Sequence, residues 1–369
     1  MSRHLRVRPR FYLVLAVAAA GLTYVGWTVL GHGPRVSHRP PSSRRGSGPV
    51  VPPRAQYTKV EGTFQRAPSQ LPLPLNDFAA VAQPGAEAII GGYTRGGRIN
   101  PLIYDLTGHG VVAEARMSRP HANGGAVKLG SEVLYVGGSH RPGMLSARIQ
   151  PVEWIAANRS APGKYQSLSR PLAAMATAVG GGAAFAVGGR LPQGASNLIY
   201  RWHATGSPRL WAHLPRALIH PAAAIFHGTL WVVGGFTPQL GYADAIYAVN
   251  LRSGRATRVA TLPVPTAHAA VAQFNGRLWI LGGKTPQGPT RHTWVIQGPH
   301  TIASGPRLPM AVAGANAFVL DHRLWVGGGQ GASGQPLQRL WWYVPPAPRP
   351  HRSRSSAPPA RRAQTGYSS

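Results

Sequence analysis

The stretch WVVGG, residues 231–235, decides the fold of this chain, because a short apolar strand ending in two glycines occurs six times. Consecutive Gly-Gly pairs are separated by 46, 51, 46, 48 and 46 residues. A period of about 45–50 residues with several short strands per repeat is typical of β-propeller blades. The other copies are AIIGG (88–92), LYVGG (134–138), FAVGG (185–189), WILGG (279–283) and WVGGG (325–329).

Each repeat carries two further strand-like segments. Small residues before the Gly-Gly pair suit an inner strand that crowds its neighbours around a central channel, and glycine permits a sharp turn or a close approach. An aromatic residue in a later strand is expected to fill the wider gap between blades. The inner segments read FAAVAQ, GGAVKL, AAMATAV, AAAIF, AAVAQF and ANAFVL, and the aromatic residues are Tyr104, Trp154, Tyr200, Tyr247, Trp294 and Trp341.

The two ends of the repeat region predict how the ring closes. After residues 341–344 the chain becomes proline-rich, so the sixth repeat lacks an outer strand. Residues 58–74 match the outer strand and the Leu-Pro run of the other repeats. We therefore predict an all-β, six-bladed propeller over residues 57–344, whose last blade is completed by the N-terminal strand.

This pattern resembles the kelch repeat of the galactose-oxidase and kelch-like propeller superfamily, in the bacterial exported form. The strand, Gly-Gly and aromatic spacing carries the resemblance, together with Leu262-Pro263 and Leu308-Pro309 between blades. Trp154 lies later than its counterparts, and the third inner strand is rich in glycine. Copper-radical oxidases of this kind need a Cys–Tyr crosslink, which a chain with no cysteine cannot form. Another resemblance, to the exported six-bladed sialic-acid epimerase, implies acid–base work on a sugar.

The N-terminus has the features of a membrane anchor. Residues 1–10 contain four arginines, and residues 11–30 are uncharged and long enough to span a bilayer. We expect a single-pass signal anchor with residues 1–10 in the cytoplasm and the propeller outside; cleavage near residues 18–20 and secretion is the alternative. Residues 31–56 and 345–369 are expected to be disordered, basic and proline-rich.

Composition limits the chemistry. The 39 Lys and Arg face nine Asp and Glu, and only four of the cations are lysine. Residues 57–344 alone carry 25 of these cations and all nine acids. An absence of cysteine excludes disulfides, zinc–thiolate clusters and a cysteine nucleophile. So few acids leave little material for a two-carboxylate glycosidase, and they suggest that the fold tolerates acid.

The channel mouth is where a propeller of this type binds its ligand. An arginine-rich rim suits carboxylate, sulfate or phosphate groups, whereas cations spread over the whole sequence are the alternative explanation. The candidate ligand-binding residues are Asp77, Tyr93, Arg95, Arg98, His121, His140, Arg141, Arg190, His220, His268, Lys284 and Arg291, with Asn123 also preceding an inner strand.

Three of these histidines precede a Gly-Gly pair at similar distances. His220 and His268 each lie 14 residues before their pair, and His121 lies 16 before its own. Equivalent positions in neighbouring blades bring imidazoles together. No carboxylate is clearly placed beside them, so we expect structural histidines and assign no metal ligand, no catalytic residue and no cofactor.

The sequence therefore favours a membrane-anchored, extracytoplasmic binding protein over an enzyme. Its cationic propeller face is predicted to meet an anionic glycan, a cell-wall polymer or a partner protein. Specific nucleic-acid recognition is not expected, because the aromatic residues belong to packing strands rather than to a basic groove. An exported sugar-modifying enzyme of the epimerase type is the alternative.

Overall fold

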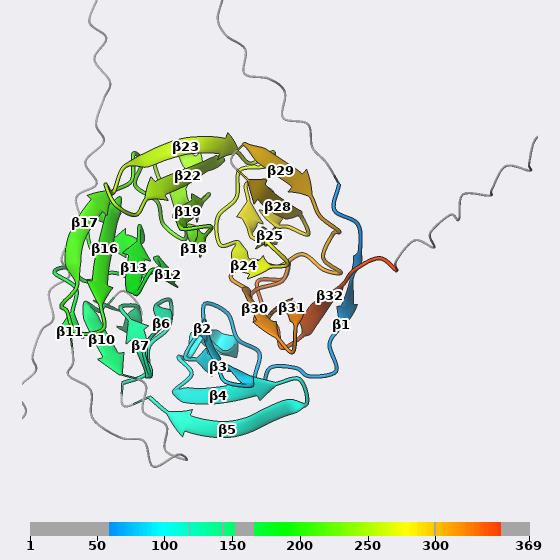
Figure 1. Cartoon of the computed structure of the whole chain (residues 1–369). Helices are drawn as coiled ribbons and strands as arrows, with labels where there is room; N and C mark the ends of the chain where they lie inside the picture. The colour runs from blue at the N-terminus through cyan, green and yellow to red at the C-terminus, as the bar shows by residue number, and fades with distance from the viewer. Residues whose placement is uncertain (1–58, 118, 142–143, 152–165, 299, 348–369) are drawn as a thin grey trace, which may run out of the picture. The chain divides into compact units, whose positions relative to one another are not determined.

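The computed structural model describes residues 59–347, except residues 118, 142–143, 152–165 and 299. Within these residues the chain forms six four-stranded antiparallel sheets, which stand side by side around a central axis (Figure 1). Five sheets are built from strands that follow one another in the chain, and the sixth combines both ends of the propeller. An all-β propeller is thus confirmed.

Each sheet runs from an inner strand at the axis to an outer strand at the circumference (Figure 1). The first two are β2 (Ala79–Gln83), β3 (Ala86–Ile90), β4 (Leu102–Thr107), β5 (Gly110–Arg116), and β6 (Gly125–Leu129), β7 (Glu132–Val136), β10 (Arg148–Pro151), β11 (Gln166–Ser167). The next two are β12 (Ala176–Gly180), β13 (Ala183–Val187), β16 (Leu198–His203), β17 (Arg209–His213), and β18 (Ala222–Phe226), β19 (Thr229–Val233), β22 (Ala245–Asn250), β23 (Ala256–Thr261). The last two are β24 (Ala270–Phe274), β25 (Arg277–Leu281), β28 (Thr293–Gly298), β29 (Thr301–Ser304), and β30 (Asn316–Leu320), β31 (Arg323–Gly327), β32 (Leu340–Val344), β1 (Thr63–Arg66).

The predicted closure by the N-terminal strand is confirmed. Strand β1 pairs with β32 in antiparallel register, with Thr63 opposite Val344 and Arg66 opposite Trp341. Phe64 of β1 is buried and packs its ring 5.7 Å from that of Tyr343. Each such buried aromatic side chain contributes about 1.5–3 kcal/mol of apolar burial, so the two chain ends hold one another in place.

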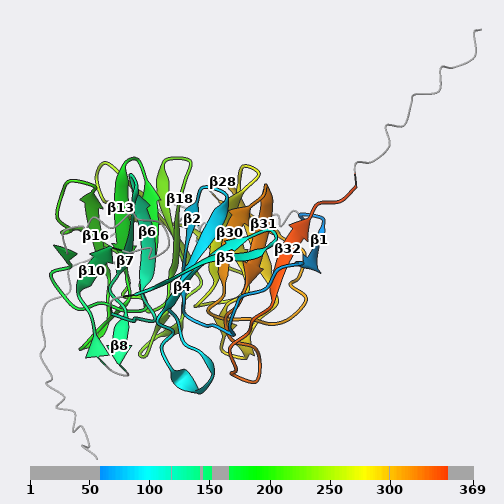
Figure 2. The ribbon, with the colours of Figure 1, turned by 90° about the horizontal axis from the view of Figure 1, so that it is seen from below.

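The loops after the Gly-Gly pairs form one rim of the propeller. In four sheets the loop is a small hairpin, and in the first sheet it contains the short 3-10 helix η1 (Arg95–Gly97). Strand β8 and the loop of η1 project from the same face (Figure 2). The hairpins are β8 (Ser139–Arg141) with β9 (Met144–Leu145), β14 (Arg190–Leu191) with β15 (Gly194–Ala195), β20 (Phe236–Thr237) with β21 (Gly241–Tyr242), and β26 (Lys284–Thr285) with β27 (Gly288–Pro289).

The Gly-Gly pairs connect neighbouring sheets. Gly234 and Gly235 both have positive φ, 59° and 114°, and the amide of Gly235 donates to the carbonyl of Thr266 in the next repeat. A Cβ on Gly234 would lie 2.0 Å from that carbonyl oxygen. The second glycine of every pair donates to a carbonyl of the following repeat in the same way. Glycine is therefore required by both backbone conformation and close approach.

The core is divided among the interfaces between sheets. Among the described residues, six clusters of buried side chains fill the gaps between neighbouring sheets, and each draws on two of them. The aromatic residues predicted to fill these gaps do so where they are described, since Tyr104, Tyr200, Tyr247 and Trp341 are all buried. Trp154 lies outside the described residues.

The predicted anchor at residues 11–30 and linker at residues 31–56 lie outside the described residues, as does the basic tail from residue 348. In the part of the chain that the structure describes, no helix is both long and apolar enough to cross a membrane.

Candidate functional site

A ring of six backbone hydrogen bonds surrounds the channel. Six residues, each 14 positions before the first glycine of its pair, enter the inner strands with φ between 49° and 65°. Each donates its amide to the carbonyl of its counterpart in the preceding sheet, at 2.7–3.4 Å, and the sixth carbonyl accepts from the first amide. The ring consists of Asp77, Asn123, Ala174, His220, His268 and Gly314.

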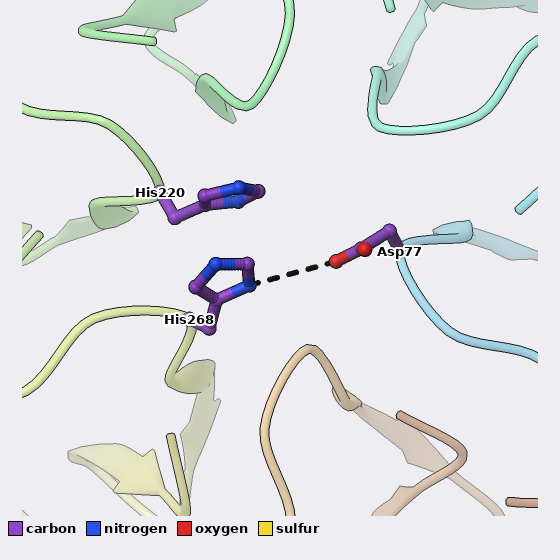
Figure 3. A group of neighbouring side chains, drawn as sticks. All are labelled: Asp77, His220 and His268. Carbon is purple, nitrogen blue, oxygen red and sulfur yellow. Dashed lines mark ion pairs between the residues drawn. The ribbon is translucent and has the colours of Figure 1, made fainter. Parts of the chain in front are cut away.

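Three side chains of this ring meet near the axis. The rings of His220 and His268 are stacked, with centroids 3.3 Å apart and planes 24° from parallel. Nδ1 of His268 lies 3.6 Å from Oδ1 of Asp77 (Figure 3). These residues lie in neighbouring positions of the ring except that Gly314, which has no side chain, separates Asp77 from His268. The expectation that no carboxylate accompanies the histidines is therefore wrong.

The Asp77 carboxylate is held from both sides. Its Oδ2 accepts a hydrogen bond of 3.0 Å from Nδ2 of the buried Asn76, while Oδ1 faces His268. Burial raises the pKa of Asp77, but hydrogen bonding to His268, the positive charges of His268 and His220, and the Asn76 amide together bring that pKa below its usual value. The carboxylate is therefore ionised at neutral pH.

His220 is in the opposite situation. Burial lowers its pKa well below the usual value, and charge on His268, Arg190 and Lys284 lowers it further, against the opposing effect of Asp77. The His220 imidazole is therefore neutral at pH 7 and offers a nitrogen lone pair to the channel.

Two adjoining cavities open around this cluster. The inner one, of about 230 Å³, is lined by the Asp77, His220 and His268 side chains and by the small residues of the inner strands. The outer one, of about 520 Å³, lies at the rim and is lined by Tyr93, Arg190 and Phe236. His220 and Asn123 line both. Burial and the negative charge of Asp77 raise the pKa of Tyr93, partly offset by a hydrogen bond with Ser139.

The structure brings together half of the predicted rim residues. Asp77, His220 and His268 line the inner cavity, Tyr93 and Arg190 line the outer one, and Lys284 is near enough to act on His220. The exposed guanidinium of Arg190 makes no ion pair or side-chain hydrogen bond with a described residue.

The other predicted residues lie elsewhere. Arg95, Arg98 and Arg141 are exposed on rim loops and line none of the cavities described here. His121 and His140 line a separate cavity beside Arg119 and Arg148. Arg291 donates to the Leu308 carbonyl and lines another cavity, near Lys59 and Trp294. His121 misses the axis because it lies two residues before the ring position, which Asn123 occupies in that repeat.

Sequence reasoning missed Asn76, Ala174 and Gly314. The signal for the ring was present, because the interval of 14 residues before the Gly-Gly pair holds in all six repeats. Applied to every repeat, it aligns Asp77 with the two histidines and supplies the carboxylate. Asn76 has no such signal, since its role follows from a side-chain contact.

These features define an all-β propeller with a His–His–Asp cluster at its axis and free cations at the channel mouth. The solved structure of YjhT is similar to it, with a TM-score of 0.63 and 11% sequence identity over 74% of this chain and 95% of that chain. Comparison with protein-family models and with curated proteins gives no match. At this identity the likeness to YjhT extends to the fold alone.

Proposed function

We propose that this protein is an exported, kelch-type propeller that binds a carboxylated or phosphorylated sugar unit of a glycan or wall polymer at the channel mouth. The observation that carries the proposal is the unpaired guanidinium of Arg190 on a cavity of about 520 Å³. Cavities of about 300–1,000 Å³ are typical of small-ligand sites, and a guanidinium binds carboxylate and phosphate groups through paired hydrogen bonds.

The surroundings of Arg190 support an anionic sugar over a neutral ligand. Lys284 adds a second positive charge near His220, and Tyr93 and Phe236 give the cavity aromatic surfaces for the apolar face of a sugar ring. The only ion pairs among the described residues are Arg258 with Asp244 and His268 with Asp77, so no described carboxylate competes for Arg190.

Binding is tested by calorimetry with the full chain and a panel of neutral, carboxylated and phosphorylated monosaccharides at ~0.15 M and ~1 M salt, where the screening length differs about threefold. We expect Arg190→Gln with Lys284→Gln to weaken binding of one anionic sugar about 10- to 100-fold, as loss of hydrogen bonds to a charged group predicts. Arg95→Gln with Arg98→Gln removes the same charge from the exposed loop and is the matched control. Equal loss in both pairs, or binding abolished by salt, would contradict a formed site.

For the cellular location we propose a single-pass anchor at residues 11–30, which leaves the propeller outside the cell on the linker of residues 31–56. The run of uncharged residues after four arginines supports this proposal. External protease should degrade the propeller in sealed cells. Protection of the propeller would contradict the orientation, and a chain shortened at residues 18–20 and released into the medium would support cleavage.

Modification of a sugar is the second candidate function, favoured by the contact between Asp77 and His268 beneath the sugar-sized cavity. A carboxylate that orients an imidazole is a common arrangement for proton transfer. Nuclear magnetic resonance would detect faster interconversion of the anomers or epimers of the bound sugar. No acceleration by wild type, or equal acceleration by Asp77→Asn, would contradict this candidate.

A further inference from the structure

The His–His–Asp cluster offers three ligand atoms at one point of the channel. One ligand atom from each of Asp77, His220 and His268 can be chosen so that all lie within 4.8 Å of one another. The separation of 3.6 Å between His268 Nδ1 and Asp77 Oδ1 is long for a hydrogen bond. It is close to the edge of a tetrahedron around Zn²⁺, roughly 3.3–3.5 Å for bonds of about 2.0–2.1 Å.

We propose that Asp77, His220 and His268 bind a divalent transition-metal ion, with Zn²⁺ as the reference ion. Two imidazole nitrogens and one carboxylate oxygen form a donor set for Zn²⁺, Cu²⁺ or Ni²⁺ rather than for Mg²⁺ or Ca²⁺, which take oxygen ligands. Three protein ligands leave a fourth position open.

The backbone places these side chains before any ion binds. His268 donates its amide to the carbonyl of His220, and this hydrogen bond of 3.0 Å sets their imidazoles face to face. Both rings extend toward Asp77 (Figure 3). A direct sandwich is not the arrangement that aromatic rings prefer. A turn of the His220 ring about its Cβ–Cγ bond directs a nitrogen toward the space between His268 and Asp77.

The neighbours of the cluster leave room for the ion and orient one ligand. Asn76 occupies Oδ2 of Asp77, so Oδ1 is directed toward the histidines, as outer hydrogen bonds to metal-binding carboxylates do. At Gly314 a Cβ would lie 2.8 Å from Asp77 Oδ1 and 3.7 Å from His268 Nδ1. The sixth sheet therefore contributes no side chain at the point where the ion would bind.

The open position of the ion faces the outer cavity through His220, which lines both cavities. Asp77 neutralises one of the two charges of the ion, and Arg190 and Lys284 add positive charge nearby. An anion or hydroxide is then a better fourth ligand than a neutral group. The ion site does not depend on the proposed sugar binding, since Arg190 and Lys284 are not among its ligands.

The test uses the full chain after treatment with a chelator and dialysis. Zn²⁺ binding is measured by calorimetry, and Co²⁺ serves as a spectroscopic probe because a tetrahedral site with nitrogen ligands gives strong visible absorption. We expect one tight equivalent in wild type, weakened at least 100-fold in His220→Asn and in His268→Asn. Asparagine is the residue that the ring itself uses at position 123 with the same backbone conformation.

The matched control is His227→Asn. His227 is exposed in the β18–β19 turn at φ 47°, outside the channel, so the substitution makes the same chemical change on the same kind of backbone. We expect this variant to bind Zn²⁺ as wild type does. Circular dichroism checks that each variant folds, and added Zn²⁺ should raise the melting temperature of wild type and His227→Asn but not of His268→Asn.

Equal Zn²⁺ affinity in wild type and both channel variants would overturn the proposal, as would a Co²⁺ spectrum indistinguishable from that of the hydrated ion. Sugar binding measured in chelator separates the two hypotheses. Retained sugar binding without Zn²⁺ binding would overturn only the ion site, and the reverse would overturn only the sugar site.

Discussion

Two pairs of histidines in this propeller have similar sequence surroundings and different chemistry. His220 and His268 stack at 3.3 Å beside an ionised carboxylate at the axis. His121 and His140 lie 5.8 Å apart with planes 58° from parallel, in a cavity lined by Arg119 and Arg148. Burial lowers the pKa of His121, and nearby positive charges lower it further, although a hydrogen bond to the Arg119 carbonyl opposes this. A binding site at the axis thus depends on the position in the ring and on Asp77, not on the presence of histidine.

The strongest way to break this comparison is to open the ring. The axial cluster joins side chains from the first, fourth and fifth sheets, so it requires closure by β1, whereas His121 and His140 belong to one stretch of chain. Deletion of residues 57–72 removes β1 and the fully buried Leu71. We expect loss of the cooperative melting transition, and with it loss of Zn²⁺ binding.

The control is an equally long deletion of residues 354–369 from the basic tail. Circular dichroism melts of the two deletions should differ clearly. An unchanged transition after deletion of residues 57–72 would contradict the role of the N-terminal strand in closure.

Glu87 provides a contrast with Asp77, because both carboxylates belong to the first sheet region but only Asp77 has polar partners. Glu87 is 3% exposed and its Oε2 has no hydrogen-bond partner, so burial raises its pKa to about 8. The folded state then binds more protons than the unfolded state between the usual pKa of 4.5 and about 8. Its contribution to stability is full below that window and is lost as the pH rises through it.

We therefore expect the free energy of unfolding of wild type to fall, relative to Glu87→Gln, by about 3 kcal/mol between pH 5 and pH 7. Urea unfolding at a series of pH values measures this difference. A constant difference across the range would contradict the raised pKa. The sign agrees with the expected tolerance of acid, since Glu87 stabilises the fold most when protonated.

Substitution of His121 sharpens the distinction between stability and binding. His121 is buried, and its Nδ1 lies 2.7 Å from the Arg119 carbonyl oxygen. Loss of that contact in His121→Asn should cost about 1–3 kcal/mol of stability and leave Zn²⁺ affinity unchanged. His268→Asn should show the opposite pattern. Parallel calorimetry and urea unfolding would contradict the distinction if both variants lost Zn²⁺ affinity to the same extent.

The smallest expected effects come from two ring positions that carry almost no side chain. Gly314→Ala adds a Cβ at φ 65° and against Asp77 Oδ1, so it should cost about 1–2 kcal/mol and weaken Zn²⁺ binding. Ala174 already has φ 54°, and Ala174→Gly should be neutral or stabilise by up to about 1 kcal/mol without changing Zn²⁺ affinity. Weakened Zn²⁺ binding in Ala174→Gly would contradict this reasoning.

The fold followed from the sequence because its signals repeat. The Gly-Gly pairs, the small inner strands and the unmatched strand at residues 58–74 are local patterns, and each requires a particular neighbour in a closed ring. The site followed only in part. The two histidines share an interval of 14 residues, but the contact of Asp77 with His268 spans a glycine position and depends on ring closure. The placement of His121 was misjudged because two residues along a strand entry direct a side chain into a different cavity.

The hydrogen-bonded ring at the axis has a consequence for how such a channel acquires new chemistry. Its six members hold left-handed backbone, which is tolerated best by glycine and, among residues with larger side chains, by asparagine, aspartate and histidine. Those same polar side chains are the ones that coordinate ions and exchange protons. Selection for a stable strand entry therefore enriches the axis in reactive groups, and because the main chain satisfies its own hydrogen bonds, each position can vary independently. The propeller is in this respect a six-position selector, in which new combinations of ligands can arise without a new fold.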